Sequence, residues 1–235
     1  MSEELLGTYQ GAPRRLGRTV HRGPLPDFSA RLLKELRRQG WRHAPAVIAR
    51  NDDGAILSYI DGMAATTRML RNSAAEDDCL SGVARLVREF HDLTAGSELA
   101  GDREVVCHNA LEPVNTIYRR IGVTLAPVAL VDWGLAAPGD RIDDVALICW
   151  RFTGLGRSAG AEMVRRRIGV VLEAYGRHGT RQEVVQAILS SQDRALSVIG
   201  ARAGAGEDKF KGLRDAGALE SIRRDRSWTE QNLVE

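Results

Sequence analysis

The residues of this sequence that could do chemistry gather in two short stretches, CHNALEPVN and VDWG. Asn115 offers an amide oxygen and Asp132, 17 residues later, a carboxylate oxygen, and both are ligands that Mg²⁺ prefers. Phosphoryl transfer to an alcohol uses such ligands, cations or amides for the nucleotide phosphates, and a carboxylate that orients and deprotonates the hydroxyl. That acid is missing, because Ala110 stands two residues after His108 and five before Asn115, where such a loop carries a carboxylate.

Short strands and one helix are expected before these stretches. The candidate strands are GRTVHR, APAVIAR and AILSYI, at residues 17–22, 44–50 and 55–60, and the turn NDDG separates the last two. Between the first two strands, FSARLLKELRRQGW places Leu32, Leu33 and Leu36 at helical spacing, with Gly40 as a stop signal. The pattern predicts a small strand, helix, strand, strand lobe.

The rest of the chain is expected to be mostly helical. A long amphipathic helix is predicted to begin at Ser73, with Glu76 three residues later as its capping partner. Two short β-like runs follow, EVVCHN and LAPVALVDW. Further helices are predicted at residues 143–152, 161–178, 180–203 and 209–232. The fold class predicted from this order is α+β.

Composition excludes several classes of protein. The 235 residues are 43% hydrophobic, and 33 Lys and Arg against 31 Asp and Glu give a net charge of +2, so neither nucleic acid nor a membrane surface is expected as a partner. Cys79, Cys107 and Cys149 lack CxxC spacing, which indicates reduced, buried thiols instead of a disulfide framework or zinc site. With no signal-like N-terminus and no apolar run near the roughly 20 residues of a membrane span, a cytoplasmic location is expected.

The order of these motifs resembles the aminoglycoside phosphotransferase and choline kinase-like family. In that family the loop reads H-G-D or H-N-D, then four residues and Asn, and the next strand ends in I-D-W or I-D-F before a helix with an acid near its start. Here the matching segments are CHNALEPVN, ALVDWGLAAPGDR and RIDDVALICW. The resemblance implies a two-lobed protein-kinase-like fold, with a small β-rich N-lobe and hinge at residues 1–62 and a larger, mostly helical C-lobe at residues 63–235.

The resemblance also implies roles for single residues in the C-lobe. Asn115 and Asp132 would be ligands of Mg²⁺, and His108 would brace the loop. Ala110 falls on the position of the catalytic base. The cofactors implied are Mg²⁺ and ATP or GTP.

In the N-lobe the resemblance implies nucleotide contacts. Gly7 and Gly11 would belong to a shortened glycine-containing loop over the phosphates, although both also suit an ordinary hairpin turn. Val20 and Arg22 share one face of a strand, so Val20 would touch adenine while Arg22 reaches phosphate in place of the usual Lys. His21 is the alternative cation.

Tyr59 and Ile60, in LSYIDG, match the hinge whose backbone reads the adenine edge in that family. The remaining histidines are given no chemistry. His91 is expected to be a cation at the C-terminal end of its helix, and His43 and His178 are expected on the surface.

Two explanations remain for Ala110. The chain is either an Asp-to-Ala form of an active enzyme or a natural pseudokinase that binds nucleotide and serves as a partner or scaffold. Because the rest of the site is intact, the first is favoured. Glu112 is an alternative acid, but it lies two residues past the base position and is expected to point elsewhere.

The charge of the C-terminal region bears on the acceptor. Residues 151–235 hold 15 Lys and Arg against 11 Asp and Glu, which disfavours polycationic aminoglycosides. A neutral or anionic hydroxylated metabolite, or a peptide Ser or Thr, fits better. A purely structural reading, a helical interaction module with a β cap, predicts no nucleotide binding.

Overall fold

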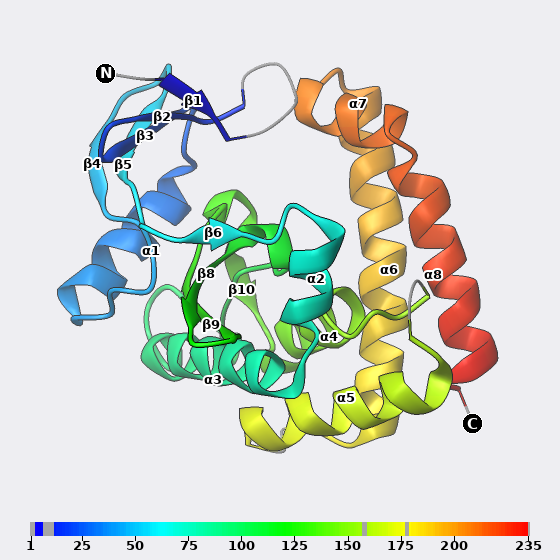
Figure 1. Cartoon of the computed structure of the whole chain (residues 1–235). Coiled ribbons are helices and arrows are strands. Elements are labelled where there is room, and N and C mark those ends of the chain that lie inside the picture. Colours follow the sequence, from blue (N-terminus) through cyan, green and yellow to red (C-terminus); the bar gives the residue numbers. More distant parts are fainter. Residues whose placement is uncertain (1–2, 7–11, 157–158, 177–178, 235) are drawn as a thin grey trace.

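The structure is a computed structural model that describes residues 3–6, 12–156, 159–176 and 179–234. Its first part is a five-stranded antiparallel sheet in the order β1-β2-β3-β5-β4, with helix α1 beside it (Figure 1). The elements are β1 Glu3–Leu5, β2 Arg14–Leu16, β3 Thr19–Arg22, α1 Asp27–Arg38, β4 Val47–Arg50 and β5 Ala55–Ser58. The predicted small lobe is present, and β1 and β2 extend its sheet beyond the strands expected from the sequence.

Helix α1 forms as its apolar spacing predicts. Leu32, Leu33 and Leu36 are buried on one face, and the chain turns at Gly40 with a φ of 85°. In the turn between β4 and β5, the side chain of Asn51 accepts hydrogen bonds from the backbone N–H groups of Asp53 and Gly54. These local signals set the shape of the small lobe.

The second part combines short strands with a helical body. Strands β6, β8 and β9 form one antiparallel sheet, and β7 pairs with β10. The strands and 3₁₀ turns are β6 Met63–Ala64, β7 Val105–Cys107, η1 Pro113–Asn115, β8 Thr116–Ile121, β9 Thr124–Leu130, η2 Trp133–Leu135 and β10 Ala137–Gly139. The helices are α2 Arg68–Ala74, α3 Asp77–Thr94, α4 Arg141–Arg151, α5 Ala161–Tyr175, α6 Arg181–Gly204, α7 Asp208–Asp215 and α8 Ala218–Asn232.

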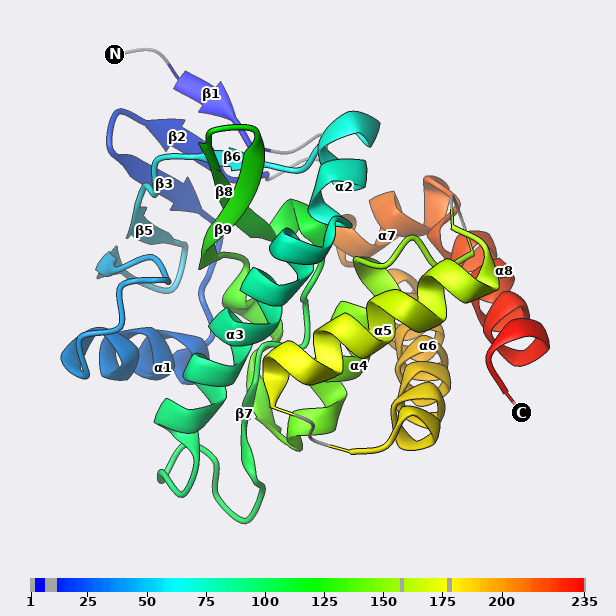
Figure 2. The same ribbon diagram turned by 60° about the horizontal axis from the view of Figure 1, so that its bottom comes forward.

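The helices form a continuous body beside the loop regions. Figure 2 shows α5 lying along α3, and α6 and α8 lie side by side in both views. Helix α7 caps the far end of α6 and faces the small lobe across the top of Figure 1. Within the described residues, no helix is long and apolar enough to cross a bilayer.

An aromatic cluster joins the two parts of the molecule. The ring centroids of Phe90 and Trp133 lie 5.0 Å apart, and those of Trp41 and Trp133 lie 6.2 Å apart. Trp41 follows α1, whereas Trp133 follows Asp132, and the Oγ of Ser29 on α1 donates to the carbonyl of Trp133 at 2.8 Å. One shared core therefore fixes the position of Asp132 relative to the small lobe.

Several predicted boundaries are wrong. The helix expected from Ser73 begins only at Asp77, as α3, and residues 73 and 74 instead end α2, which was not predicted and which Thr67 caps by accepting from the N–H of Leu70. The helix expected at residues 209–232 is likewise two, since Gly217 adopts a left-handed φ of 79° between α7 and α8.

Candidate active site

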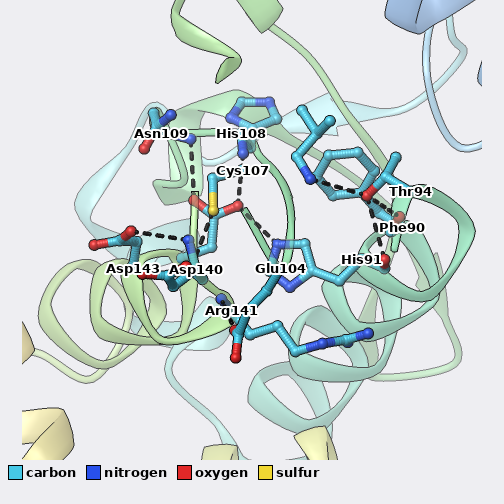
Figure 3. A network of polar contacts seen from close by, with 12 residues as sticks. Phe90, His91, Thr94, Glu104, Cys107, His108, Asn109, Asp140, Arg141 and Asp143 are labelled. Atoms are coloured by element: carbon cyan, nitrogen blue, oxygen red, sulfur yellow. Dashed lines mark hydrogen bonds and ion pairs between the residues drawn. The ribbon is translucent and has the colours of Figure 1, made fainter. Parts of the chain in front are cut away.

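The loop at residues 108–115 is anchored from beneath by Asp144, which is fully buried on α4. Its carboxylate accepts hydrogen bonds from the backbone N–H of His108 at 2.6 Å and of Asn109 at 3.0 Å, and its Oδ2 lies 3.1 Å from Nε2 of His91. Figure 3 shows these three residues converging on one carboxylate. Burial alone would raise the pKa of Asp144, but the hydrogen bond and charge of His91, with His108, hold it below its ordinary value.

The acid-rich segment GDRIDD explains how Asp144 reaches this position. Asp140 is the N-cap of α4, and Asp143, three residues later, accepts from the backbone N–H of Asp140 at 3.2 Å. Asp143 also pairs with Arg194 at 2.9 Å on the outside of the helix. Asp144 is therefore the acid of the first turn that points inward, beneath the loop.

His91 lies in the last turn of α3, as predicted. It is nevertheless fully buried, because it lies on the apolar face of α3 next to Phe90. Its Nδ1 lies 2.6 Å from the hydroxyl of Tyr175, opposite its contact with Asp144. His43, which was expected on the surface, is half-buried, with its Nδ1 2.8 Å from the carbonyl of Val128. His178 lies outside the described residues.

The loop itself closes around position 110. Asn109 adopts a left-handed φ of 59°, and the N–H of Ala110 donates to Nδ1 of His108 at 3.3 Å. The side-chain Nδ2 of Asn115 donates to the carbonyl of Ala110 at 2.9 Å. This bond turns the Nδ2 of Asn115 toward the loop and leaves its Oδ1 as the atom with which it can bind a cation.

His108 is fully buried against the ring of Trp133, with centroids 4.4 Å apart. Burial lowers its pKa, although Asp144 and Asp132 oppose the shift. The neutral ring then accepts from Ala110 at Nδ1, so His108 braces the loop and does not itself face the open site.

Asp132 lies beside Asn115. The N–H of Val131 donates to the carbonyl of Asn115 at 2.9 Å, and Asp132 follows with a left-handed φ of 62°. Its Oδ2 lies 2.8 Å from Nζ of Lys209, and its Oδ1 lies 3.8 Å from Nη1 of Arg22. Burial raises the pKa of Asp132, but the charge and hydrogen bond of Lys209, followed by the charge of Arg22, lower it overall.

Lys209 is the functional candidate that sequence reasoning missed. It lies on α7, 77 positions after Asp132 in the chain, and no local motif marks it. The oxygen donors of Asn115 and Asp132 fit a hard cation such as Mg²⁺. A metal ion at Asp132 would share or replace the contact that Lys209 makes.

Three more N-lobe candidates lie within the described residues. Val20 packs against the main core, and Tyr59 and the half-buried Ile60 directly follow β5. The backbone N–H of Tyr59 already donates to the carbonyl of Arg18. The guanidinium of Arg15 lies 3.7 Å from the centroid of the Tyr59 ring. Gly7 and Gly11 lie outside the described residues.

The carboxylate of Glu112 pairs with Arg151 at 2.7 Å, so the structure gives it an ion-pair role. A second cluster also serves the scaffold: ligand atoms of His91, Cys107 and Asp144 lie within 4.8 Å of one another. Burial raises the pKa of the Cys107 thiol, which donates to the carbonyl of Asp140, so these groups form a hydrogen-bonded anchor for the loop.

Comparison with known proteins places this arrangement among solved folds. An ethanolamine kinase from Plasmodium vivax superposes with a TM-score of 0.70 at 10% identity, over 97% of this chain and 81% of that one. A choline/ethanolamine kinase family protein from Mesorhizobium loti gives a TM-score of 0.63 at 13% identity, over 98% and 93% of the two chains. The aminoglycoside phosphotransferase APH(3'')-Id from Streptomyces rimosus, in complex with ADP and streptomycin, gives 0.56 at 16% identity, over 79% and 90%.

Sequence comparison adds one curated relative. The trifolitoxin immunity protein of Rhizobium leguminosarum bv. trifolii is 25% identical over an alignment of 205 residues that covers 75% of each protein. No family model matches the chain. The structural likenesses show the fold, and they confirm the prediction of a two-lobed, protein-kinase-like α+β architecture.

Proposed function

We propose that this chain binds the Mg²⁺ complex of a nucleoside triphosphate, ATP or GTP, between an N-lobe at residues 1–62 and a C-lobe at residues 63–235. The scaffold is that of a phosphotransferase acting on the hydroxyl of a small metabolite or a peptide Ser or Thr, in the cytoplasm. One observation carries the proposal: the loop anchored by Asp144 turns Asn115 toward Ala110 and sets it beside Asp132. A metal site and an acceptor position therefore adjoin each other.

Every role in the proposed reaction can be assigned to a residue of this site, except that of the general base. Oδ1 of Asn115 and the carboxylate of Asp132 would hold Mg²⁺, which when bound supplies positive charge to the phosphate oxygens. Arg22 lies against Asp132 and would add positive charge toward the phosphates, whereas Lys209 occupies the other oxygen of Asp132 until a metal ion binds there. At position 110 the methyl group of alanine can neither orient nor deprotonate a hydroxyl, so the chain as it stands is catalytically impaired.

Ala110→Asp tests the proposal. The general base and orienting group contribute about 10² to 10⁴ in rate, so the variant should gain nucleotide hydrolysis or phosphoryl transfer of that order over the parent. Ala110→Asn is the matched control, because it adds similar volume without a carboxylate. If Ala110→Asp binds Mg·ATP but neither hydrolyses it nor phosphorylates any of a broad set of hydroxylated metabolites and peptides, the enzyme reading is wrong and the alternative, a natural nucleotide-binding pseudokinase, takes its place.

Immunity to a toxin is a second candidate function, favoured by the name of the curated relative. A protein of this fold could give immunity by phosphorylating a toxin or by binding it in a nucleotide-dependent way. The chain and its Ala110→Asp variant should be expressed separately in a trifolitoxin-sensitive strain. Protection by the variant alone indicates phosphoryl transfer, and protection by both indicates binding. Equal sensitivity with and without either protein contradicts this candidate.

A further inference from the structure

A cavity of about 300 Å³ opens beside the loop at residues 108–115. Its lining combines three arginines, Arg68, Arg71 and Arg151, with Pro113 of the loop and Phe152. The arginines come from two separate regions, since Arg68 and Arg71 belong to α2, whereas Arg151 ends α4. The cavity has the size of a small-metabolite site.

The charge of this cavity is not balanced by its own walls. No acidic side chain is among the described residues that line it. Arg71 donates to the carbonyl of Thr66 at 3.0 Å, and Arg68 has no ion-pair partner among the residues that the structure describes. Arg151 pairs with Glu112 at 2.7 Å and lies over the ring of Trp150, which holds its guanidinium in place. Arg68 and Arg71 therefore bring two uncompensated positive charges to the cavity.

The cavity is within reach of the reacting position. Pro113 is three residues from Ala110, and three residues of extended chain span at most about 10 Å. The hydrogen bond from Asn115 to the carbonyl of Ala110 closes this turn and shortens the path further. A small molecule held in the cavity could present a hydroxyl at position 110.

We propose that this cavity, the arginine pocket, binds the anionic group of the acceptor, a phosphate or a carboxylate. Guanidinium groups recognise both anions through paired, charge-assisted N–H donors. A cationic acceptor such as an aminoglycoside would face like charge here, and a neutral one would leave the charges of Arg68 and Arg71 uncompensated. The assignment to an acceptor rests on the proposed phosphotransferase function, whereas anion binding by the pocket stands on its own residues.

Nuclear magnetic resonance of the arginine Nε–Hε groups tests the pocket directly. Inorganic phosphate and acetate are titrated separately at constant ionic strength with chloride, without nucleotide or metal. We expect the signals of Arg68, Arg71 and Arg151 to shift and to reach saturation as the anion concentration rises. The anion that binds with the higher affinity shows whether the pocket prefers phosphate or carboxylate. In Arg68→Gln/Arg71→Gln, the Arg151 signal should report an affinity at least about ten-fold weaker.

The control is Arg85→Gln/Arg224→Gln, which removes two exposed arginines that do not line the cavity. It should keep the affinity of the parent. The proposal is overturned if the shifts do not saturate, if both double variants lose affinity equally, or if the Arg22 signal responds while those of Arg68 and Arg71 do not. Because no nucleotide is present, failure of Ala110→Asp to transfer phosphate would leave a positive result here intact.

Discussion

Asp132 is the residue at which the charges of the site meet. One of its oxygens faces Lys209 at 2.8 Å and the other faces Arg22 at 3.8 Å, so the carboxylate is neutralised by side chains from α7 and β3. Any metal ion that binds there competes with an ammonium group for Oδ2. Lys209 should therefore set how much magnesium the site requires.

Lys209→Met should lower the magnesium concentration that half-saturates nucleotide binding. A partly exposed ion pair contributes about 1 kcal/mol at most, so the shift should be about five-fold or less. Lys211→Met is the matched control, because Lys211 lies on the same helix and pairs with Asp208 at 3.2 Å. Calorimetric titration of nucleotide at a series of magnesium concentrations measures the shift. A higher magnesium requirement in Lys209→Met would mean that the lysine assists the phosphates instead of competing with the metal.

At this scale the sequence predicted what short-range spacing can encode. His108, Ala110, Asn115 and Asp132 lie in two stretches joined by a hairpin, and the structure brings them together as expected. Lys209 could not be predicted, because its position depends on how α7 packs against α6 and α8. The burial of His91 was not predicted for a related reason: its neighbours Tyr175 and Asp144 come from other helices.

At the scale of elements, α3 and α4 hold the loop from beneath. Asp144→Asn should destabilise the protein by about 3 kcal/mol, because it removes a buried charge that serves two backbone N–H groups and His91. Asp143→Asn, on the same helix turn, should lower the free energy of unfolding by about 1 kcal/mol or less, because it removes only a helix-cap contact and a surface ion pair. Chemical denaturation compares the two. Equal losses would show that Asp144 is no more than an ordinary helix-terminus acid.

Helix existence was predicted better than helix ends. Helices α1, α4, α5 and α6 lie close to their predicted ranges, because apolar spacing and caps such as Thr180 mark them locally. Helix α2 was not predicted, and the break at Gly217 was missed because apolar residues such as Leu213 and Ile222 lie on both sides of it. The strands β1 and β2 have three residues each, and Glu4, Leu5 and Arg14 are exposed, so little alternation distinguishes these strands.

At the scale of the whole molecule, stability should depend on pH through His108. Burial lowers its pKa in the folded protein, whereas the unfolded chain has the ordinary value near about 6.5. The unfolded state then binds more protons below that pH, so the free energy of unfolding should fall as pH drops through about 6.5, by at most about 1.4 kcal/mol per pH unit for this group.

His108→Asn should flatten this pH dependence, because asparagine can accept from Ala110 but does not titrate. Urea denaturation of the parent and the variant at a series of pH values between about 5.5 and 8 gives the two slopes. Parallel curves for the parent and the variant would show that His108 is not the titrating group.

The two-lobed fold was predicted because its motifs follow one another in a recognisable order, and the aromatic cluster around Trp133 shows why the parts act as one body. The arrangement of α7 over the site could not be predicted from the same order. It depends on long-range packing, which no single stretch of sequence encodes.

Nucleotide binding at Asn115 and Asp132 can be measured by calorimetric titration of the unaltered chain with Mg·ATP and Mg·GTP, with Asp132→Asn as the comparison. We expect saturable binding of at least one nucleotide, dependent on magnesium in the parent and independent of it in Asp132→Asn. Absence of heat and of thermal stabilisation with both nucleotides, or equal magnesium-dependent binding by Asp132→Asn, would contradict the site assigned to Asn115 and Asp132.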